Sequence, residues 1–199
     1  MNLNLTKRDV ARELARRYST MTHEELDMLE SVLVPMKFAK NELILKEGEV
    51  CTNIYWVGKG LVRQFYFKNN KEVTEYMAAE DTIVMSIESL FKETPSTQVI
   101  KTMEPSIVYA LPKRELEAVA MKSVNIQILY RKILEESLII SQQRADVLRF
   151  ESAQDRYIKF AKSSPQILLR APLLYIASYL QMTPETLSRV RTAALMNNV

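Results

Sequence analysis

The polar side chains between positions 183 and 192 are the residues of this 199-residue chain best suited to bind another molecule. If this segment is a helix whose Leu187 and Val190 face the core, its polar side chains point outward. Arginine can donate two hydrogen bonds to guanine and glutamate can accept one from cytosine. Serine and threonine can form hydrogen bonds with several bases, and polar side chains beside this face can contact phosphates. We therefore predict seven DNA contacts: Thr183, Glu185, Thr186, Ser188, Arg189, Arg191 and Thr192.

Catalytic and metal chemistry has few residues to use, because Cys51 is the only cysteine and His23 the only histidine. One cysteine excludes a disulfide within the chain, a four-cysteine cluster and a zinc finger. A cupin-like barrel enzyme needs several histidines inside its strands, and His23 precedes them. We therefore predict that the protein is not an enzyme and has no catalytic residues and no metal, haem or iron–sulfur cofactor. We expect Cys51 to be buried.

Positive charge is concentrated in the last quarter of the chain. Residues 152–199 contain six Lys and Arg against two Asp and Glu, whereas residues 1–151 contain 21 against 22. This asymmetry suits a polyanionic partner, although an ordinary solvated surface can have it too.

The elements that would position the polar face are two helices joined by a tight turn. The first is predicted to start at Leu173 and carries the small residue Ala177, where a second helix can cross closely. Thr183 can cap the second helix, and Pro184 suits its first position. Apolar residues occupy the slots that would face a shared core: Ile176, Leu180, Met182, Leu187 and Val190. This pattern is typical of a helix-turn-helix.

A helical hairpin of this kind also occurs in proteins that do not bind DNA. The turn of a helix-turn-helix usually contains glycine, and here the residue is Gln181. A left-handed conformation at a non-glycine residue costs about 1–2 kcal/mol. The alternative is a ligand- or protein-binding regulatory module that no longer binds DNA.

Between Phe38 and Pro112 the pattern changes to short β-forming runs. The seven runs are LILKEGE, NIYWVGKG, LVRQFYFKNN, KEVTEYMAAE, TIVMS, TQVIKTME and SIVYALP. Their close, even spacing predicts an antiparallel barrel or sandwich. All three glycines lie here, where tight turns or close backbone approaches are expected: Gly48, Gly58 and Gly60. Asn69-Asn70 is a further hairpin turn candidate.

Helices flank this region on both sides. One is predicted over 6–18, and a second starts at Thr22, whose hydroxyl and Glu25 form a capping box. We expect Pro35 to end the second helix. After the strands, Ser152 and Asp155 predict the start of a helix over 153–162.

Residues 124–149 predict one long helix with two apolar stripes. One stripe is Ile126, Tyr130, Ile133, Ile140 and Val147, interrupted at Ser137 and Arg144; the other is Leu134, Leu138, Ala145 and Leu148. One stripe can pack on the strands and the other on a second copy of the helix, which predicts a homodimer. A long core helix in a monomer is the alternative.

These elements predict an α+β protein with three parts. Residues 1–112 would form helices and a sensor domain, 113–151 a connecting and dimerisation helix, and 152–199 a helix-turn-helix domain. No apolar run is long enough to span a membrane, and the first residues lack a signal-peptide pattern, so we expect a cytoplasmic protein without membrane contact.

The order of parts resembles the Crp/Fnr, or catabolite-activator, family over nearly the whole chain. The resemblance is carried by KNELILKEGE (40–49), IYWVGKGLVRQFY (54–66), SAQDRYIKF (152–160) and IASYLQMTPETLSRVR (176–191), the last of which is similar to a group common in Bacteroidetes. It implies a cyclic-nucleotide-binding-type β-roll, or jelly roll, before the dimerisation helix, and a helix-turn-helix domain after it. We expect this domain to lack the family's usual winged β-hairpin, because only eight residues follow Arg191. The resemblance also implies a bacterial homodimer that reads a palindromic operator in double-stranded DNA, with RNA polymerase and a small-molecule effector as partners.

The resemblance does not extend to the residues that bind cyclic AMP. Relatives that bind it use a Gly-Glu pair for the ribose and an Arg-Ser or Arg-Thr pair for the phosphate. Residues 81–100 contain neither Gly nor Arg, so we predict an effector other than cyclic AMP. Five polar residues are candidates for its pocket, or else ordinary helix and turn residues: Glu88, Ser89, Ser96, Thr97 and Gln98.

Overall fold

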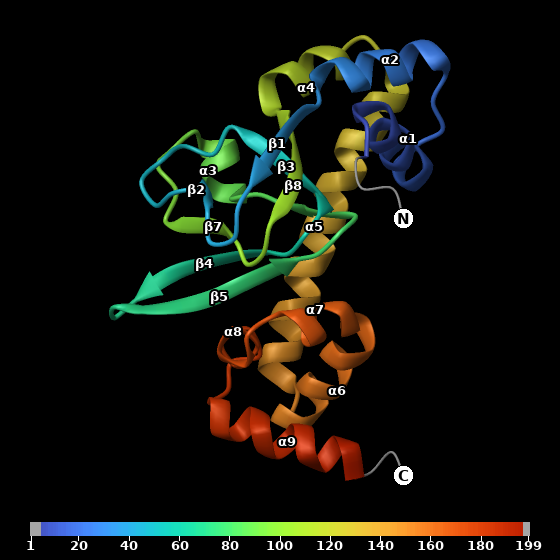
Figure 1. Cartoon of the computed structure of the whole chain (residues 1–199). Helices are drawn as coiled ribbons and strands as arrows, with labels where there is room; N and C mark the ends of the chain where they lie inside the picture. Colours follow the sequence, from blue (N-terminus) through green and yellow to red (C-terminus); the bar gives the residue numbers. More distant parts are fainter. Residues whose placement is uncertain (1–4, 197–199) are drawn as a thin grey trace.

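A computed structural model describes residues 5–196 as a β-roll between two groups of helices. Figure 1 shows the N-terminal helices at one end, the C-terminal helices at the other, and one long helix, α5, running past the roll between them. The long helix therefore connects all parts of the molecule.

The N-terminal helices are α1 (Lys7–Tyr18) and α2 (His23–Val32). Both start with a capping box, in which the threonine hydroxyl at the cap accepts from the third helical N–H and the acidic side chain there accepts from the cap N–H. The capping box predicted at Thr22 and Glu25 is confirmed.

The roll consists of two four-stranded antiparallel sheets packed as a sandwich. One sheet has the order β1-β8-β3-β6, with β1 at Val34–Phe38, β8 at Ser106–Pro112, β3 at Asn53–Lys59 and β6 at Thr82–Val84. The other has the order β2-β7-β4-β5, with β2 at Leu43–Leu45, β7 at Gln98–Thr102, β4 at Val62–Lys68 and β5 at Lys71–Ala78. All seven predicted strands are present.

The prediction that strands begin only after Phe38 is wrong. β1 starts at Val34 and includes Pro35. Proline has no N–H to donate, but β1 is an edge strand that pairs only with β8, so it has a free side that tolerates the missing donor.

The predicted turns form as expected. Gly48 and Gly60 have φ values of 84° and 105°, and Asn69 and Asn70 have 51° and 59° in the turn between β4 and β5. A Cβ added at Gly58 would lie 2.8 Å from the Tyr109 ring, so this glycine permits close packing.

Helices make up the rest of the described chain. They are α3 (Ile87–Lys92) within the roll, α4 (Lys113–Ala120), α5 (Val124–Phe150), α6 (Ala153–Ser163), α7 (Pro165–Arg170), α8 (Leu173–Tyr179) and α9 (Pro184–Met196). The predicted helices at 124–149 and 153–162 are confirmed, and Ser152 caps α6 through the Asp155 N–H. Residues 113–196 contain helices and their connecting turns but no β-strand.

Two apolar clusters hold these elements together. The larger joins α1, α2, α4, the roll and the first half of α5, whose Ile126, Leu129 and Ile133 are buried. The smaller joins Leu61 and Met77 of the roll region to the C-terminal helices. The C-terminal helices therefore pack directly on the roll.

Candidate nucleic-acid interface and ligand pocket

The helices α8 and α9 form the predicted hairpin. Ile176, Leu180 and Leu187 are buried in the small cluster, while Met182 and Val190 pack on it partly buried. Ala177 is also buried, at the predicted small-residue position. The predicted core side of the two helices is therefore confirmed.

The turn between α8 and α9 adopts the geometry expected of its residues. Gln181 has a φ of 50°, and the following Met182 N–H donates to the Ala177 carbonyl at 3.0 Å. This is the pattern in which a left-handed residue ends a helix. Thr183 then caps α9, because its Oγ1 accepts from the Thr186 N–H at 3.2 Å.

Six of the seven predicted DNA contacts are exposed, and Thr186 is half-buried. Arg189 lies within hydrogen-bond distance of the Thr186 hydroxyl, at 3.3 Å, which places their polar groups together. A hydrogen bond from Thr183 lowers the pKa of Glu185, so its carboxylate is ionised at neutral pH. α9 lies at the end of the molecule farthest from the N-terminal helices (Figure 1).

Two arginines hold the carbonyls at the end of α8. Arg144 of α5 donates to the Tyr179 carbonyl at 3.2 Å, and Arg156 of α6 reaches the Gln181 carbonyl at 3.4 Å. Cationic side chains are favourable at a helix C-terminus, where carbonyls lack helical partners. They fix the turn from which α9 starts.

The open edge of the roll also binds α8. β5 is an edge strand, so part of its backbone has no neighbouring strand. The Thr74 N–H donates to Ser178 Oγ at 2.8 Å, and the Thr74 carbonyl accepts from Arg144 at 3.3 Å. Residues of α8 and α5 therefore satisfy both backbone groups of Thr74 at this edge.

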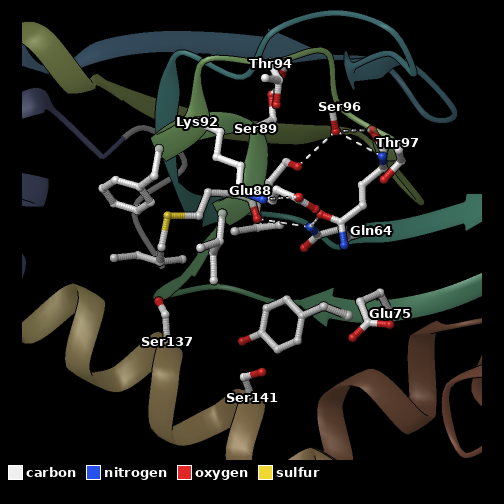
Figure 2. A pocket seen from close by; sticks show the side chains of 18 of the residues that line it. Gln64, Glu75, Glu88, Ser89, Lys92, Thr94, Ser96, Thr97, Ser137 and Ser141 are labelled. Carbon is white, nitrogen blue, oxygen red and sulfur yellow. Dashed lines mark hydrogen bonds and ion pairs between the residues drawn. The ribbon is translucent and has the colours of Figure 1, made fainter.

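A pocket of about 690 Å³ lies between the roll and α5. Its walls come from α3, the segment before β7, strands β4 to β6 and one face of α5. Figure 2 shows Ser137 and Ser141 on α5 across from Glu88 and Gln64. All five residues predicted to bind a ligand line this one pocket: Glu88, Ser89, Ser96, Thr97 and Gln98.

The predicted residues differ in how free they are to bind a ligand. The Ser89 hydroxyl accepts a hydrogen bond from the Cys51 N–H and donates one to the Thr94 carbonyl, so it links two backbone segments of the pocket wall. Ser96 is likewise occupied by Ser86 and by the backbone of Gln98. These two serines shape the pocket, whereas Thr97 is exposed.

Three residues that bring polar groups to the pocket are not among those predicted from the sequence: Gln64, Tyr76 and Arg144. Burial raises the pKa of Tyr76 to about 12, so its hydroxyl is neutral. Arg144 pairs with Glu75, with Nε and Oε1 3.6 Å apart. The interruptions of the apolar stripe at Ser137 and Arg144 were the available signal, since both residues line the pocket.

Other predicted features are placed as follows. Cys51 is buried, and burial raises the pKa of its thiol, whereas His23 is exposed. Within residues 5–196, no group of three or more His, Cys, Asp and Glu side chains is arranged to hold a metal ion. Nor does that part of the chain contain a helix with the length and apolar character needed to cross a membrane.

Comparisons with known proteins agree with this architecture. Residues 35–123 match the family model of the cyclic nucleotide-binding domain. A search of curated proteins finds no match. The structure is similar to FixK2 of Bradyrhizobium japonicum, with a TM-score of 0.73 and 18% identity over 84% of this chain and 87% of that one.

Two further structures share the fold. The catabolite activator protein of Thermus thermophilus has a TM-score of 0.56 and 20% identity, covering 94% of this chain and 88% of its own. A protein of Eubacterium rectale assigned to the Crp/Fnr family has a TM-score of 0.65 and 14% identity, covering 89% and 85%. Residues 35–123 therefore resemble the cyclic nucleotide-binding domain, within a chain whose fold is that of solved Crp/Fnr-type structures.

Proposed function

We propose that this protein is a transcription regulator that binds duplex DNA as a homodimer through α9 and responds to a small molecule other than cyclic AMP. The observation that carries the proposal is the division of α9 into two faces. Leu187 is buried in the apolar cluster that includes residues of α6 and α8, while Glu185, Ser188 and Arg189 lie exposed on the other side. This division leaves the polar face open to a major groove.

The charge around α9 supports a phosphate backbone as partner. The segment 152–196 is net positive, and Arg189 and Arg191 are both exposed on α9. Arginine contacts to phosphates position a protein on DNA, and contacts to base edges select the sequence. In this proposal Arg189 and Glu185 read bases, while Thr186 and Arg191 contact phosphates.

Exposed apolar residues on α5 support a dimer. Leu138 is 70% exposed and Ile139 is 55% exposed, although both lie in the middle of a long helix. A second copy of α5 packed on this face would cover them, as in a two-stranded coiled coil. A two-fold dimer places two α9 helices on half-sites separated by a helical turn or a multiple of it.

The charges of the pocket support an effector other than cyclic AMP. Its two cations are already paired, Lys92 with Glu88 at 2.8 Å and Arg144 with Glu75. A cyclic phosphate would have to break one of these pairs to gain a charged partner. We expect 1 mM cyclic AMP (roughly the weakest affinity of interest) to leave the unfolding temperature unchanged.

DNA binding can be tested without knowing the operator. Binding sites are selected from a random duplex library, and affinity for the selected duplex is measured by fluorescence anisotropy. We expect a palindromic consensus, and a loss of about 10-fold or more for Arg189→Ala, because one bidentate base contact discriminates by about 1–3 kcal/mol. Arg114→Ala is the matched control, since Arg114 is 84% exposed on α4, far from α9.

Salt dependence separates this function from its alternative. Phosphate contacts predict that log K falls linearly with log salt, with a slope of about −0.9 for each phosphate neutralised. If no duplex is enriched, or if Arg189→Ala and Arg114→Ala bind equally, the protein is better explained as a ligand- or protein-binding module.

A further inference from the structure

The side chain of Gln64 is buried inside the roll, yet half of its amide group is free. The residue is only 6% exposed, and its Nε2 donates to the Met85 carbonyl at 3.0 Å and to Gln98 Oε1 at 2.7 Å. A carbonyl can only accept, so Met85 fixes which end of the Gln64 amide is the nitrogen. Among the described residues, Gln64 Oε1 has no hydrogen-bond partner.

The same bond fixes the amide of Gln98. Its oxygen accepts from Gln64, so its nitrogen is left with two donors and no partner among the described side chains and backbone. Both glutamines line the pocket, where Figure 2 shows Gln64 facing the space between the roll and α5. The joined amides therefore present a free acceptor beside a free donor.

Apart from the Tyr76 hydroxyl and several serine and threonine hydroxyls, the rest of the pocket is apolar or carries paired charges. Its apolar wall comes from the roll, α3 and α5: Ile83, Met85, Ile87, Phe91 and Ile140. Each of its carboxylates, on Glu75 and Glu88, faces a cation at 3.6 Å and 2.8 Å respectively. A charged ligand would lose its hydration here without finding an unpaired opposite charge, and this loss is costly.

We propose that the pocket binds an uncharged small molecule that carries an amide or lactam on an apolar body. The ligand N–H donates to Gln64 Oε1, and the ligand carbonyl accepts from Gln98 Nε2. A volume of about 690 Å³ is within the usual size of small-molecule sites. This inference rests on the proposed function only in treating the pocket as its effector site.

Three probes of equal length test the charge preference directly. They are 4-phenylbutanamide, 4-phenylbutanoate and 4-phenylbutylammonium, titrated against the full chain without DNA and followed by ligand-observed NMR. We expect the amide to bind at least about 10-fold more tightly than either ion, since burying an uncompensated charge is strongly unfavourable. Equal binding of the three, tighter binding of an ion, or no binding of the amide overturns the proposal.

A substitution at Gln98 tests the assigned atoms. Gln98→Glu keeps the shape of the side chain but replaces its free donor with a charged acceptor. We therefore expect the affinity for 4-phenylbutanamide to fall about 10-fold and the affinity for the ammonium probe to rise. Gln166→Glu is the control, because Gln166 is exposed on α7 away from the pocket. If Gln98→Glu does not fold, Gln98→Leu replaces it, with loss of amide binding expected.

The outcome is independent of DNA binding. If the amide preference fails while a palindromic duplex is still bound, the ligand class is wrong and the regulator stands. If the amide binds but no duplex is selected, the ligand class stands and the DNA-binding function fails. An unchanged amide affinity in both Gln98 variants overturns the assignment of the site.

Discussion

The guanidinium of Arg63 lies over the ring of Tyr175, 3.8 Å from its centroid. Arg63 belongs to β4 and is only 3% exposed, while Tyr175 belongs to α8. The Phe65 ring covers the same guanidinium at 4.3 Å, and Thr74 accepts a hydrogen bond from its Nε. The hairpin β4–β5 therefore holds the first helix of the candidate DNA-binding pair through a buried cation.

Removing the Tyr175 ring should weaken this contact. We expect Tyr175→Ala to lower the free energy of unfolding by about 1–3 kcal/mol, because the ring supplies both packing and a cation–π contact to a desolvated arginine. Urea unfolding followed by circular dichroism measures the change. Tyr175→Phe keeps the ring and should stay within about 0.5 kcal/mol of the wild type; equal losses in both variants would contradict the role of the ring.

Arg144 should control the local stability of the turn between α8 and α9. Arg144→Met removes the bonds to the Tyr179 and Thr74 carbonyls together with the pair to Glu75. Hydrogen bonds from charged groups contribute about 1.5–3 kcal/mol, so amide exchange near Met182 should accelerate about 10-fold or more. Hydrogen-exchange mass spectrometry measures this, with exposed Arg149→Met as the control. Unchanged exchange near Met182 would argue against the contact.

Local signals explain why most elements are predictable from the sequence. Caps such as Thr22 and Thr183 act within four residues of their own position, so they are visible without the fold. β1 is different, because Pro35 disfavours a strand unless one side of that strand is free. Whether a side is free depends on strand order, which is a property of the whole sheet.

The pocket shows where sequence reasoning stops. The five lining residues predicted from the sequence all lie within residues 88–98, close enough in sequence to be proposed together. The unpaired amide oxygen of Gln64 is identified only through the hydrogen bond of its nitrogen to the Met85 carbonyl, 21 residues away. Arg144 enters from α5, and only its interruption of an apolar stripe distinguished it. Contacts over such distances follow from packing and not from local pattern.

Gln181 should carry measurable backbone strain. Its φ of 50° lies in the left-handed region, which costs a non-glycine residue about 1–2 kcal/mol. We expect Gln181→Gly to raise the unfolding temperature by a few degrees, even though glycine also gains freedom in the unfolded chain. Gln142→Gly, in the interior of α5, should lower it instead. A decrease in both variants would show that the turn is not strained.

Glu25 should make stability depend on pH. Hydrogen bonds from Ser123, the Thr22 N–H and Asn125 lower the pKa of Glu25 to about 2, below its ordinary value. A lowered folded-state pKa stabilises the fold above the unfolded pKa, and this stabilisation is lost as pH falls toward 2. Glu25→Gln should therefore be less stable than the wild type at pH 7 and nearly equal to it near pH 2. Urea titrations at several pH values test this, with a pH-independent difference as the contradicting result.

Arg170 should couple the C-terminal helices to the roll. Its guanidinium lies 2.7 Å from Glu80 Oε2 and 2.5 Å from Glu104 Oε1, and these hydrogen bonds raise its pKa. All three side chains are partly buried, so solvent screens the interaction only in part. A double-mutant cycle of Arg170→Met and Glu104→Gln should give a coupling energy of about 1–2 kcal/mol.

The pair between Arg114 and Glu93 is the control for this cycle. Its atoms are 3.8 Å apart, and its side chains are 84% and 55% exposed. Exposed pairs contribute about 0–1 kcal/mol, so its coupling energy should be smaller and should vanish in 1 M salt (a Debye length of roughly 3 Å). If both cycles gave the same value, the contact of Arg170 with the roll would be an ordinary surface pair. The packing of Leu61 and Met77 on the C-terminal helices would then have to hold the two parts together.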